Sequence, residues 1–340
     1  MPKPIVLSAP APRSLDLIFT PAARARLHET YEVMECPGDL LDTLPDAVLR
    51  YARYILGQPP VTAPVLARLA ALRAVLNVES NLIDNMPYAD LFQRGIHVVT
   101  TGAVFARPVA ELGLALALDL LRGVTEADLA FRQRRELWGG DGNTGARLLT
   151  GAEVGIIGFG DLGRSLREVL TGFRPVLRAF DPWLPPSLLA EAGVVPADLD
   201  TVLGQSDVVF VTAAVTSENR GFLNADAFSR MRPGAAFILL SRADVVDFDA
   251  LMAAVAAGHI TAASDVFPQE PLAPDHPVRA LKGFLRSAHR AGALDVAFKQ
   301  MGDMVLEDMA LMDRGLPPMR CKRAERETVA RMRSRPVTRN

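Results

Sequence analysis

Three residues in the second half of the chain combine side-chain types that could transfer a proton on a carboxylic acid. Arg242 follows the apolar run AAFILLS, Glu270 lies just beyond ITAASDVF, and His289 ends GFLRSAH. A guanidinium can hold a carboxylate through its planar fork of donors. Histidine can give or take a proton near neutral pH. A carboxylate beside it would fix its tautomer and favour its protonated form, so the set predicts chemistry on a 2-hydroxy or 2-keto acid.

The elements that carry these residues predict where they meet. In open α/β sheets, ligands bind at the carboxyl ends of the strands. The residues expected at that edge are Gly158, Asp181, Ala213, Arg242, Asp265, Glu270 and His289. The alternative is that His289 is a strand-end histidine without a catalytic role. The expected proximity of Arg242 and Glu270 disfavours that interpretation. The other histidines lack such polar neighbours and are expected to be structural or solvated: His28, His97, His259 and His276.

A glycine-rich turn predicts a dinucleotide site. GFGDLG places Gly158, Gly160 and Gly163 between an apolar strand and a helix. The first glycine permits a tight turn, the second lets backbone approach the pyrophosphate, and the third lets helix and strand pack closely. The helix N-terminus would face the phosphates with free N–H groups. We expect the Asp161 side chain, in the first turn of that helix, to point away from them.

The cofactor predicted from this turn is NAD, which would exchange a hydride with the acid. Asp181 ends VLRAFD, where a carboxylate can accept from both ribose hydroxyls and repel a 2′-phosphate. Arg178 is on the opposite strand face, so it cannot offset that repulsion. Asp265 could accept from the nicotinamide end. The predicted cofactor-binding residues are Gly158, Gly160, Asp161, Leu162, Gly163, Asp181, Leu240, Arg242 and Asp265.

Strand-like and helical patterns alternate along nearly the whole chain, which predicts an α/β protein with parallel sheets. A first series spans residues 1–103, and a second, with six strands, follows a long apolar helix predicted over 107–134. The helix ALDVAFKQMGDMVLEDMALMDRG comes after the second sheet is complete and is expected to return to the first unit. The predicted domains are therefore 1–103 plus 291–340, and 104–290.

Composition narrows the class of protein. A formal net charge of −2 gives no reason to expect nucleic acid or a membrane surface as a partner. Two cysteines without metal-ligand spacing predict no metal site and no disulfide framework, which suits a reducing compartment. No signal peptide or transmembrane run is recognisable, so a cytoplasmic protein is expected. The basic stretch 319–340 is interpreted as a solvated, partly disordered terminus rather than a nucleic-acid site.

These residues resemble the D-isomer-specific 2-hydroxyacid dehydrogenase family, from about Leu72 to Gly315. VGIIGFGDLGRSL is similar to its cofactor fingerprint, and SRADVVD, SDVFPQEPLAPDHPVRAL and SAH are similar to its catalytic segments. The resemblance implies two Rossmann-like, doubly wound parallel-sheet domains, one a flavodoxin-like substrate domain and the other NAD-binding. It implies catalytic roles for Arg242, Glu270 and His289, and a homodimer that uses the long 107–134 helix.

Departures from the family pattern leave the substrate open. Ala243 and Ala288 stand where glycine and proline are usual, and the substrate loop reads NVESN instead of being glycine-rich. Within the resemblance, Ser80, Asn81 and Arg242 are the predicted substrate-binding residues. Glu79 would repel a carboxylate if it faced the substrate, so either it points away or the substrate is unusual. The alternative to an NAD-dependent dehydrogenase is an NAD-sensing, corepressor-like binding protein on the same fold.

Overall fold

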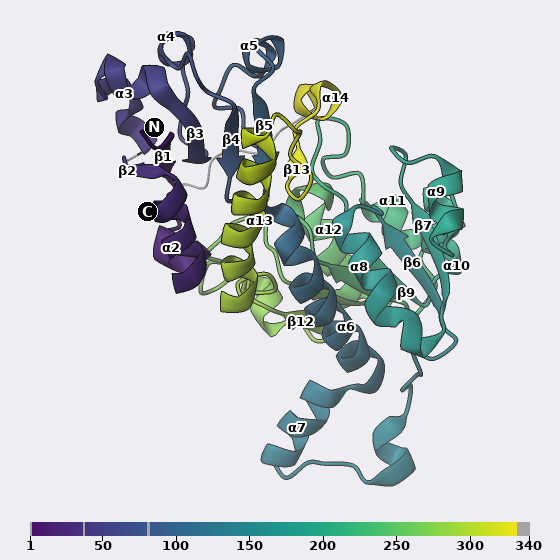
Figure 1. Cartoon of the computed structure of the whole chain (residues 1–340). Coiled ribbons are helices and arrows are strands. Elements are labelled where there is room, and N and C mark those ends of the chain that lie inside the picture. Colours follow the sequence, from purple (N-terminus) through teal and green to yellow (C-terminus); the bar gives the residue numbers. More distant parts are fainter. Residues whose placement is uncertain (1, 37, 80–81, 332–340) are drawn as a thin grey trace. The chain divides into compact units, whose positions relative to one another are not determined.

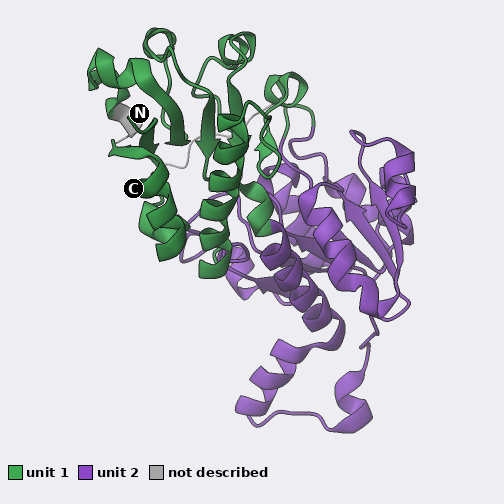
Figure 2. Ribbon diagram, viewed as in Figure 1, with its two compact units in different colours: residues 1–105, 216–218, 293–340 green, residues 106–215, 219–292 purple. Residues whose placement is uncertain are grey.

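The chain folds into two compact units, each with its own β-sheet (Figure 2). The computed structural model describes residues 2–36, 38–79 and 82–331. Unit 1 comprises Met1–Phe105, Thr216–Glu218 and Ala293–Asn340, and unit 2 comprises Ala106–Val215 and Asn219–Gly292. The boundaries drawn from the sequence fall after residues 103 and 290, and they do not include the short return of 216–218 to unit 1.

Unit 1 is built on a sheet whose described strands run in the order β13-β5-β4-β3-β1-β2. All are parallel except β13, which pairs antiparallel with β5. Apart from β13 this is the flavodoxin-like order, in which the direction of strand addition across the sheet reverses between β1 and β3. The strands are β1 (Ile5–Ala9), β2 (Glu32–Glu35), β3 (Ala52–Gly57), β4 (Ala74–Asn77), β5 (His97–Thr100) and β13 (Lys322–Arg323).

Helices cover both faces of this sheet because successive strand residues point to opposite sides. Val6, Leu56 and Val99 pack against one group of helices, whereas their neighbours in sequence pack against another. The first group is α1 (Leu15–Ile18), α2 (Pro21–Thr30) and α13 (Asp295–Asp313). The second is α3 (Asp46–Tyr51), α4 (Ala63–Arg68) and α5 (Tyr88–Gln93). The predicted return of the final helix is thus seen as α13 in the core of unit 1.

The C-terminal stretch that we interpreted as solvated and partly disordered forms regular elements as far as residue 331, although most of its side chains are exposed. β13 extends the sheet and is followed by the short helix α14 (Arg326–Ala330), while Ala324 is buried in the core. Arg331 accepts a hydrogen bond from the Ser217 backbone and lies 3.6 Å from the Glu218 carboxylate, which groups 216–218 with unit 1. The basic composition of this stretch gave no indication of these few apolar and backbone contacts. Residues 332–340 lie outside the described residues.

Unit 2 is built on a parallel sheet whose described strands run in the order β12-β11-β10-β9-β6-β7-β8. The first strand, β6, lies in the middle of the sheet, and the direction of strand addition reverses between β6 and β9. A doubly wound sheet binds a dinucleotide at this point. The strands are β6 (Glu153–Ile157), β7 (Val176–Phe180), β8 (Val195–Pro196), β9 (Val208–Val211), β10 (Ala236–Leu239), β11 (Thr261–Ser264) and β12 (Phe284–Arg286). Six of these were predicted, and the two-residue β8 was not.

One face of this sheet packs against α10 (Leu199–Gln205), α11 (Ala225–Ser229) and α12 (Phe248–Ala256). The helices α6 (Ala106–Arg122) and α8 (Asp161–Leu170) pack against each other, and α6 also contacts β10 and β11. The two remaining helices are α7 (Val124–Arg132) and α9 (Pro186–Glu191). Short 3₁₀ turns lie at Gly38–Thr43, Gly102–Phe105, Gly139–Asn143, Thr171–Phe173, Ala243–Val245 and Pro277–Ala280.

The prediction of one continuous helix over 107–134 is wrong. Gly123 has φ 63°, a left-handed conformation that ends α6 and lets α7 start in a new direction (Figure 1). The apolar periodicity continues across this glycine, which is why the sequence reads as a single element. The α/β class with two doubly wound parallel sheets is confirmed. Within the described part of the chain, no helix is long and apolar enough to cross a membrane.

Candidate functional site

The glycine turn between β6 and α8 has the geometry of a phosphate cradle. Gly158 has φ 91°, and a Cβ there would lie 2.6 Å from the backbone of Ala213, so only glycine fits. A Cβ on Gly163 would lie 2.5 Å from the Gly158 carbonyl oxygen, which explains the close helix–strand packing. Space is open beside Gly160, where α8 begins. A pyrophosphate could therefore approach the backbone N–H groups at the start of this helix.

Asp161 and Leu162, two further predicted cofactor residues, occupy the first turn of α8. Asp161 is exposed and Leu162 is half-buried. A carboxylate in a first helical turn is favoured by the helix dipole, whatever ligand it faces.

Asp181 lies beside this turn, at the carboxyl end of β7. One of its carboxylate oxygens accepts from the Phe159 N–H at 2.7 Å, and the other accepts from the Trp183 N–H at 2.9 Å. Each oxygen keeps a further lone pair that could accept from a ribose hydroxyl. Arg178 is ion-paired with Glu153 instead, as expected for a residue on the other face of the strand.

Arg242 follows β10 at the same edge of the sheet. Its backbone is extended, its side chain is half-buried, and its Nη1 donates to the Ser241 carbonyl oxygen at 2.7 Å. Leu240, two residues earlier, is buried against α6, since a Cβ on Gly113 would meet its Cδ1 at 2.5 Å. Any contact of Leu240 with a cofactor would therefore come from its backbone.

Glu270 and His289 form a hydrogen-bonded pair. Glu270 Oε2 lies 2.6 Å from His289 Nδ1, and Oε1 accepts from the Phe267 N–H at 2.8 Å. Burial by itself would raise the pKa of the Glu270 carboxyl. The hydrogen bonds from His289 and Phe267, together with the positive charges of His289 and Arg242, outweigh burial and hold that pKa below its usual range. Glu270 and His289 are thus in contact, and Arg242 lies near enough for its charge to act on Glu270.

Asp265 has a role that sequence reasoning missed. Its side chain is 1% exposed, and its two oxygens accept from the backbone N–H groups of Arg290 and Ala291, both at 3.0 Å. The Asp265 carbonyl oxygen also accepts from the His289 N–H at 2.7 Å. His289 has φ 47°, in the left-handed region that few residues other than glycine adopt, although histidine adopts it more often than most. Asp265 therefore holds the segment that presents the imidazole, and its contact with nicotinamide stays a prediction.

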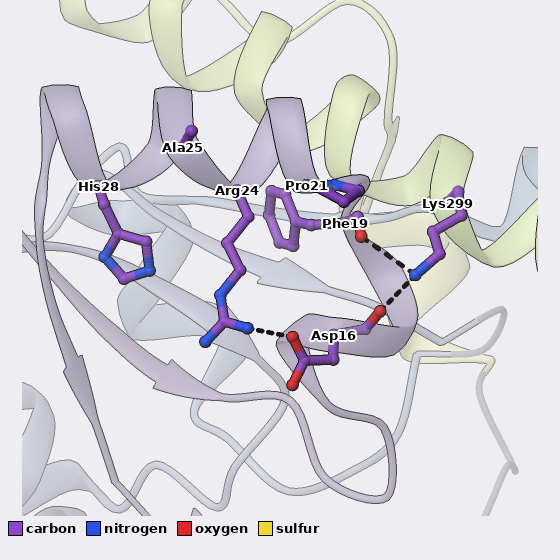
Figure 3. A pocket seen from close by; sticks show the side chains of 7 residues that line it. All are labelled: Asp16, Phe19, Pro21, Arg24, Ala25, His28 and Lys299. Atoms are coloured by element: carbon purple, nitrogen blue, oxygen red, sulfur yellow. Dashed lines mark hydrogen bonds and ion pairs between the residues drawn. The ribbon is translucent and has the colours of Figure 1, made fainter.

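The remaining predicted substrate residues, Ser80 and Asn81, lie outside the described residues. Elsewhere in unit 1, a hollow of about 370 Å³ lies between α1, α2 and the start of α13 (Figure 3). Its cations are already engaged, because Arg24 pairs with Asp16 and Lys299 donates to backbone carbonyls. None of the predicted site residues lines it. Across the described ranges, no group of histidines, cysteines and carboxylates could hold a metal ion.

The sheet order, glycine turn and strand-end aspartate of unit 2 define a dinucleotide-binding α/β domain. Residues 114–291, more than half of the chain, match the model of the D-isomer specific 2-hydroxyacid dehydrogenase NAD-binding domain. The chain belongs to this family, as its motifs led us to expect, and NAD is the cofactor of the matched domain. The open start of α8 and the placement of Asp181 fit that cofactor.

Solved and curated relatives agree with this membership. A crystal structure described as a phosphoglycerate oxidoreductase from Rhizobium etli is 68% identical, with TM-score 0.89, over 95% of this chain and 99% of that one. A glyoxylate reductase of Korarchaeum cryptofilum is 30% identical over 76% of this chain and 79% of its own. A D-3-phosphoglycerate dehydrogenase of Archaeoglobus fulgidus is 30% identical over 69% of this chain but 44% of its own. The chain thus spans about half the length of the curated phosphoglycerate dehydrogenases it matches.

Proposed function

We propose that the protein is an NAD-dependent dehydrogenase that interconverts a D-2-hydroxy acid and the corresponding 2-keto acid. The observation that carries the proposal is the Glu270–His289 pair, 2.6 Å apart, with the charge of Arg242 close enough to lower the pKa of Glu270. A protein that only binds a dinucleotide has no need of this arrangement. Bound NADH would supply the hydride.

The chain's own residues then have to move one proton and hold one carboxylate. His289 Nδ1 faces Glu270, so Nε2 is the ring nitrogen left for the substrate. In keto-acid reduction, protonated His289 donates from Nε2 to the carbonyl oxygen, and in hydroxy-acid oxidation the neutral ring accepts that proton. Glu270 keeps the ring oriented and stabilises its charged form. Arg242 grips the substrate carboxylate and polarises the carbonyl.

A preference for NAD over NADP is part of the proposal. The Asp181 carboxylate would accept from the ribose hydroxyls and repel a 2′-phosphate. The observation that supports it is the anchoring of both carboxylate oxygens by backbone N–H groups, which keeps the charge beside the glycine turn. Because Arg178 is engaged by Glu153, it is not placed to neutralise that charge.

The test is an assay of the purified protein with NADH and a panel of 2-keto acids, read as loss of NADH absorbance. We expect turnover of at least one small 2-keto acid, and a loss on the order of 10²–10⁴-fold in His289→Ala. His28→Ala, a histidine of unit 1 outside the proposed site, is the matched control and should retain the parental rate. NADH binding without turnover of any acid, unaffected by His289→Ala, would instead favour the NAD-sensing alternative.

We also propose that two copies of the chain associate through α7 and the segment that follows it. The helix α7 and the segment after it form an arm of unit 2 (Figure 1). Nothing in α7 is buried, and large apolar side chains are exposed along this arm. They are Val124, Leu129, Phe131, Leu137, Trp138 and Leu148, each more than half exposed. A monomeric protein rarely leaves so many neighbouring apolar side chains in water, and a second copy presents the same surface around a two-fold axis.

Light scattering at micromolar concentration should give twice the mass of the chain. Leu129→Glu should give the monomer mass because it places a charge in the apolar surface. Leu188→Glu, on α9 of the same unit, introduces the same charge at another exposed leucine and should leave the mass doubled. A monomer in the parent protein would refute the proposal.

A further inference from the structure

The connection from β11 to β12 carries Glu270 without the support of an α-helix. Every other connection between successive strands of the unit 2 sheet contains an α-helix, whereas this one, described throughout, contains only the 3₁₀ turn Pro277–Ala280. Outside helices and strands, carbonyl groups that are shielded from water need other donors. Side chains must therefore fix this segment, residues 265–283, which we call the Glu270 loop.

Arg279 holds the part of the Glu270 loop that directly follows Glu270. Its Nε donates to the Ala273 carbonyl oxygen and its Nη2 to the Leu272 carbonyl oxygen, both at 2.7 Å. The planar fork of a guanidinium suits two neighbouring acceptors, because its donors point in fixed directions. Since Leu272 follows Glu270 closely in the chain, this fork fixes the backbone just beyond that carboxylate.

Arg286 ties the other end of the Glu270 loop to the strand that leads to His289. It is the last residue of β12 and pairs with Ser264 of β11. Its Nε donates to the Val278 carbonyl oxygen, and its Nη2 donates to the Leu281 carbonyl oxygen. Val278 is fully buried in the core of unit 2, so the fork attaches β12 to a fixed point of the loop.

Aromatic packing restrains the same elements. Three rings pack against Phe248 of α12, with centres 5.7, 6.3 and 6.0 Å from its own, and they belong to Phe267, His276 and Phe284. The first two lie in the Glu270 loop and the third in β12. Aromatic pairs at such distances attract each other. Because the Phe267 N–H donates to Glu270 Oε1, this packing also acts on the carboxylate.

These contacts close a ring around the acid–base pair. From Glu270 the ring passes through the Arg279 fork to the 3₁₀ turn, and then through the Arg286 fork to β12 and His289. The hydrogen bond of 2.6 Å between Glu270 and His289 completes it. Release of either fork would let the loop move away from β12 while the strands of the sheet stay paired.

We infer that Arg279 and Arg286 are positioning residues for catalysis: their forks keep the Glu270 carboxylate within hydrogen-bond distance of His289. The inference rests on the dehydrogenase function proposed above. The role is geometric, since the positive charges that lower the pKa of Glu270 are those of His289 and Arg242. A displacement of about 1 Å in a reacting group can cost on the order of 10²-fold in rate.

Arg286→Met removes the fork with little change in side-chain length. In the keto-acid assay kcat should fall on the order of tenfold, with KM for the acid and Kd for NADH near the parental values, because Arg242 and the glycine turn are on other strands. Arg286→Lys keeps the charge but lacks the fork, so its kcat should also fall. A parental kcat in either variant would overturn the inference.

Arg147→Met is the matched control. Arg147 Nη2 also donates to a backbone carbonyl in unit 2, that of Gly234, but this contact lies outside the Glu270 loop. Its loss should therefore leave kcat and the pH–rate profile at the parental values. An equal fall of kcat in Arg147→Met would reduce the effect of Arg286→Met to a general loosening of unit 2 and would contradict the positioning role.

A double variant separates positioning of Glu270 from any independent effect of Arg286. Arg286→Met should move the limbs of the pH–rate profile to lower pH, the direction expected for Glu270→Gln, because the imidazolium loses the same partner. In Arg286→Met/Glu270→Gln that partner is already gone, so kcat should lie within about twofold of that of Glu270→Gln alone. Effects that multiply would show that Arg286 acts independently of Glu270.

Arg279→Met provides a second variant should Arg286→Met not fold. Arg279 is exposed on the 3₁₀ turn, so its replacement leaves the core of unit 2 untouched. It removes the other fork of the ring, and both kcat and the pH–rate profile should change in the same directions as in Arg286→Met. Parental values in Arg279→Met would refute its positioning role.

The imidazole NMR signal of His289 distinguishes a failure of this inference from a failure of the proposed function. The chain has five histidines, and the signal of His289 is assigned by its absence in His289→Ala. Its titration midpoint, measured without substrate, should move to lower pH in Glu270→Gln and in both arginine-to-methionine variants, but not in Arg147→Met. That result would support positioning even if no keto acid is reduced. A midpoint moved by Glu270→Gln alone would refute positioning and leave the pair intact, and one moved by no variant would refute both.

Discussion

Replacing Glu270 by glutamine tests whether the pair with His289 controls proton transfer. The carboxylate stabilises the imidazolium relative to the neutral ring, and the amide of glutamine keeps a hydrogen-bonding oxygen without the charge. A charge-assisted hydrogen bond contributes roughly 1.5–3 kcal/mol when it is shielded, and an exposed ion pair below about 1 kcal/mol. The His289 and Glu270 side chains are 43% and 35% exposed, so we take about 1 kcal/mol for the lost charge after solvent screening.

That energy converts to a displacement of the pH–rate profile. At about 1.4 kcal/mol per tenfold change, about 1 kcal/mol corresponds to a change of about fivefold in rate on the limb where the proton is limiting. Reduction needs the imidazolium, so its rate falls as pH rises, and oxidation needs the neutral ring, so its rate rises over the same range. In Glu270→Gln both limbs should lie at lower pH, with reduction about fivefold slower on its falling limb, because the imidazolium loses its stabilising charge.

The assay is the pH dependence of kcat in both directions, with saturating cofactor and the best acid of the panel. Asp275→Asn is the matched control, because it removes an exposed carboxylate from the same loop without touching His289. His289→Ala should flatten both limbs. If the Glu270→Gln profiles overlay those of the parent, the two residues are not coupled, and the acid–base role of His289 loses its support.

Four further predictions follow from the site. Asp181→Ala should narrow the preference for NADH over NADPH in fluorescence titrations, and equal affinities in the parent would contradict the NAD assignment. Arg242→Lys keeps the charge but loses the planar fork, so kcat/KM for the keto acid should fall strongly with NADH binding unchanged. Asp265→Asn should lower the free energy of unfolding by about 2 kcal/mol in denaturant titrations and reduce kcat, and a weaker Kd for NADH would reveal a direct cofactor contact. The pKa of Glu270 is depressed in the folded protein, so its carboxylate stabilises the fold above its unfolded pKa. The stability gap between the parent and Glu270→Gln should therefore shrink as pH falls through the folded pKa.

The sequence by itself determined the layers of the fold and the edge at which the site lies. Apolar runs such as DVVFVTAA and AAFILLS are buried on both faces in β9 and β10. Such continuous apolar runs predict parallel strands, because a strand that is buried on both faces needs apolar residues at every position. The glycines of the turn were recognisable for the same reason, since Gly158 adopts a conformation that other residues avoid. The pairing of Glu270 with His289, within reach of the Arg242 charge, followed from the rule that parallel strands end at one edge.

Only the tertiary structure decided how individual polar groups are engaged. The burial of Asp265 under the backbone of residues 290 and 291 depends on a short stretch that returns to β11. Likewise, Arg13 forms an ion pair with Glu79, 66 residues further along the chain, and the pairing depends on Phe105 and Phe298, which come from two further segments. Gly123 ends α6 although the apolar periodicity continues beyond it. Local patterns report which face of an element is buried, whereas the partner of a charged side chain is set by packing between distant segments, which no local pattern encodes.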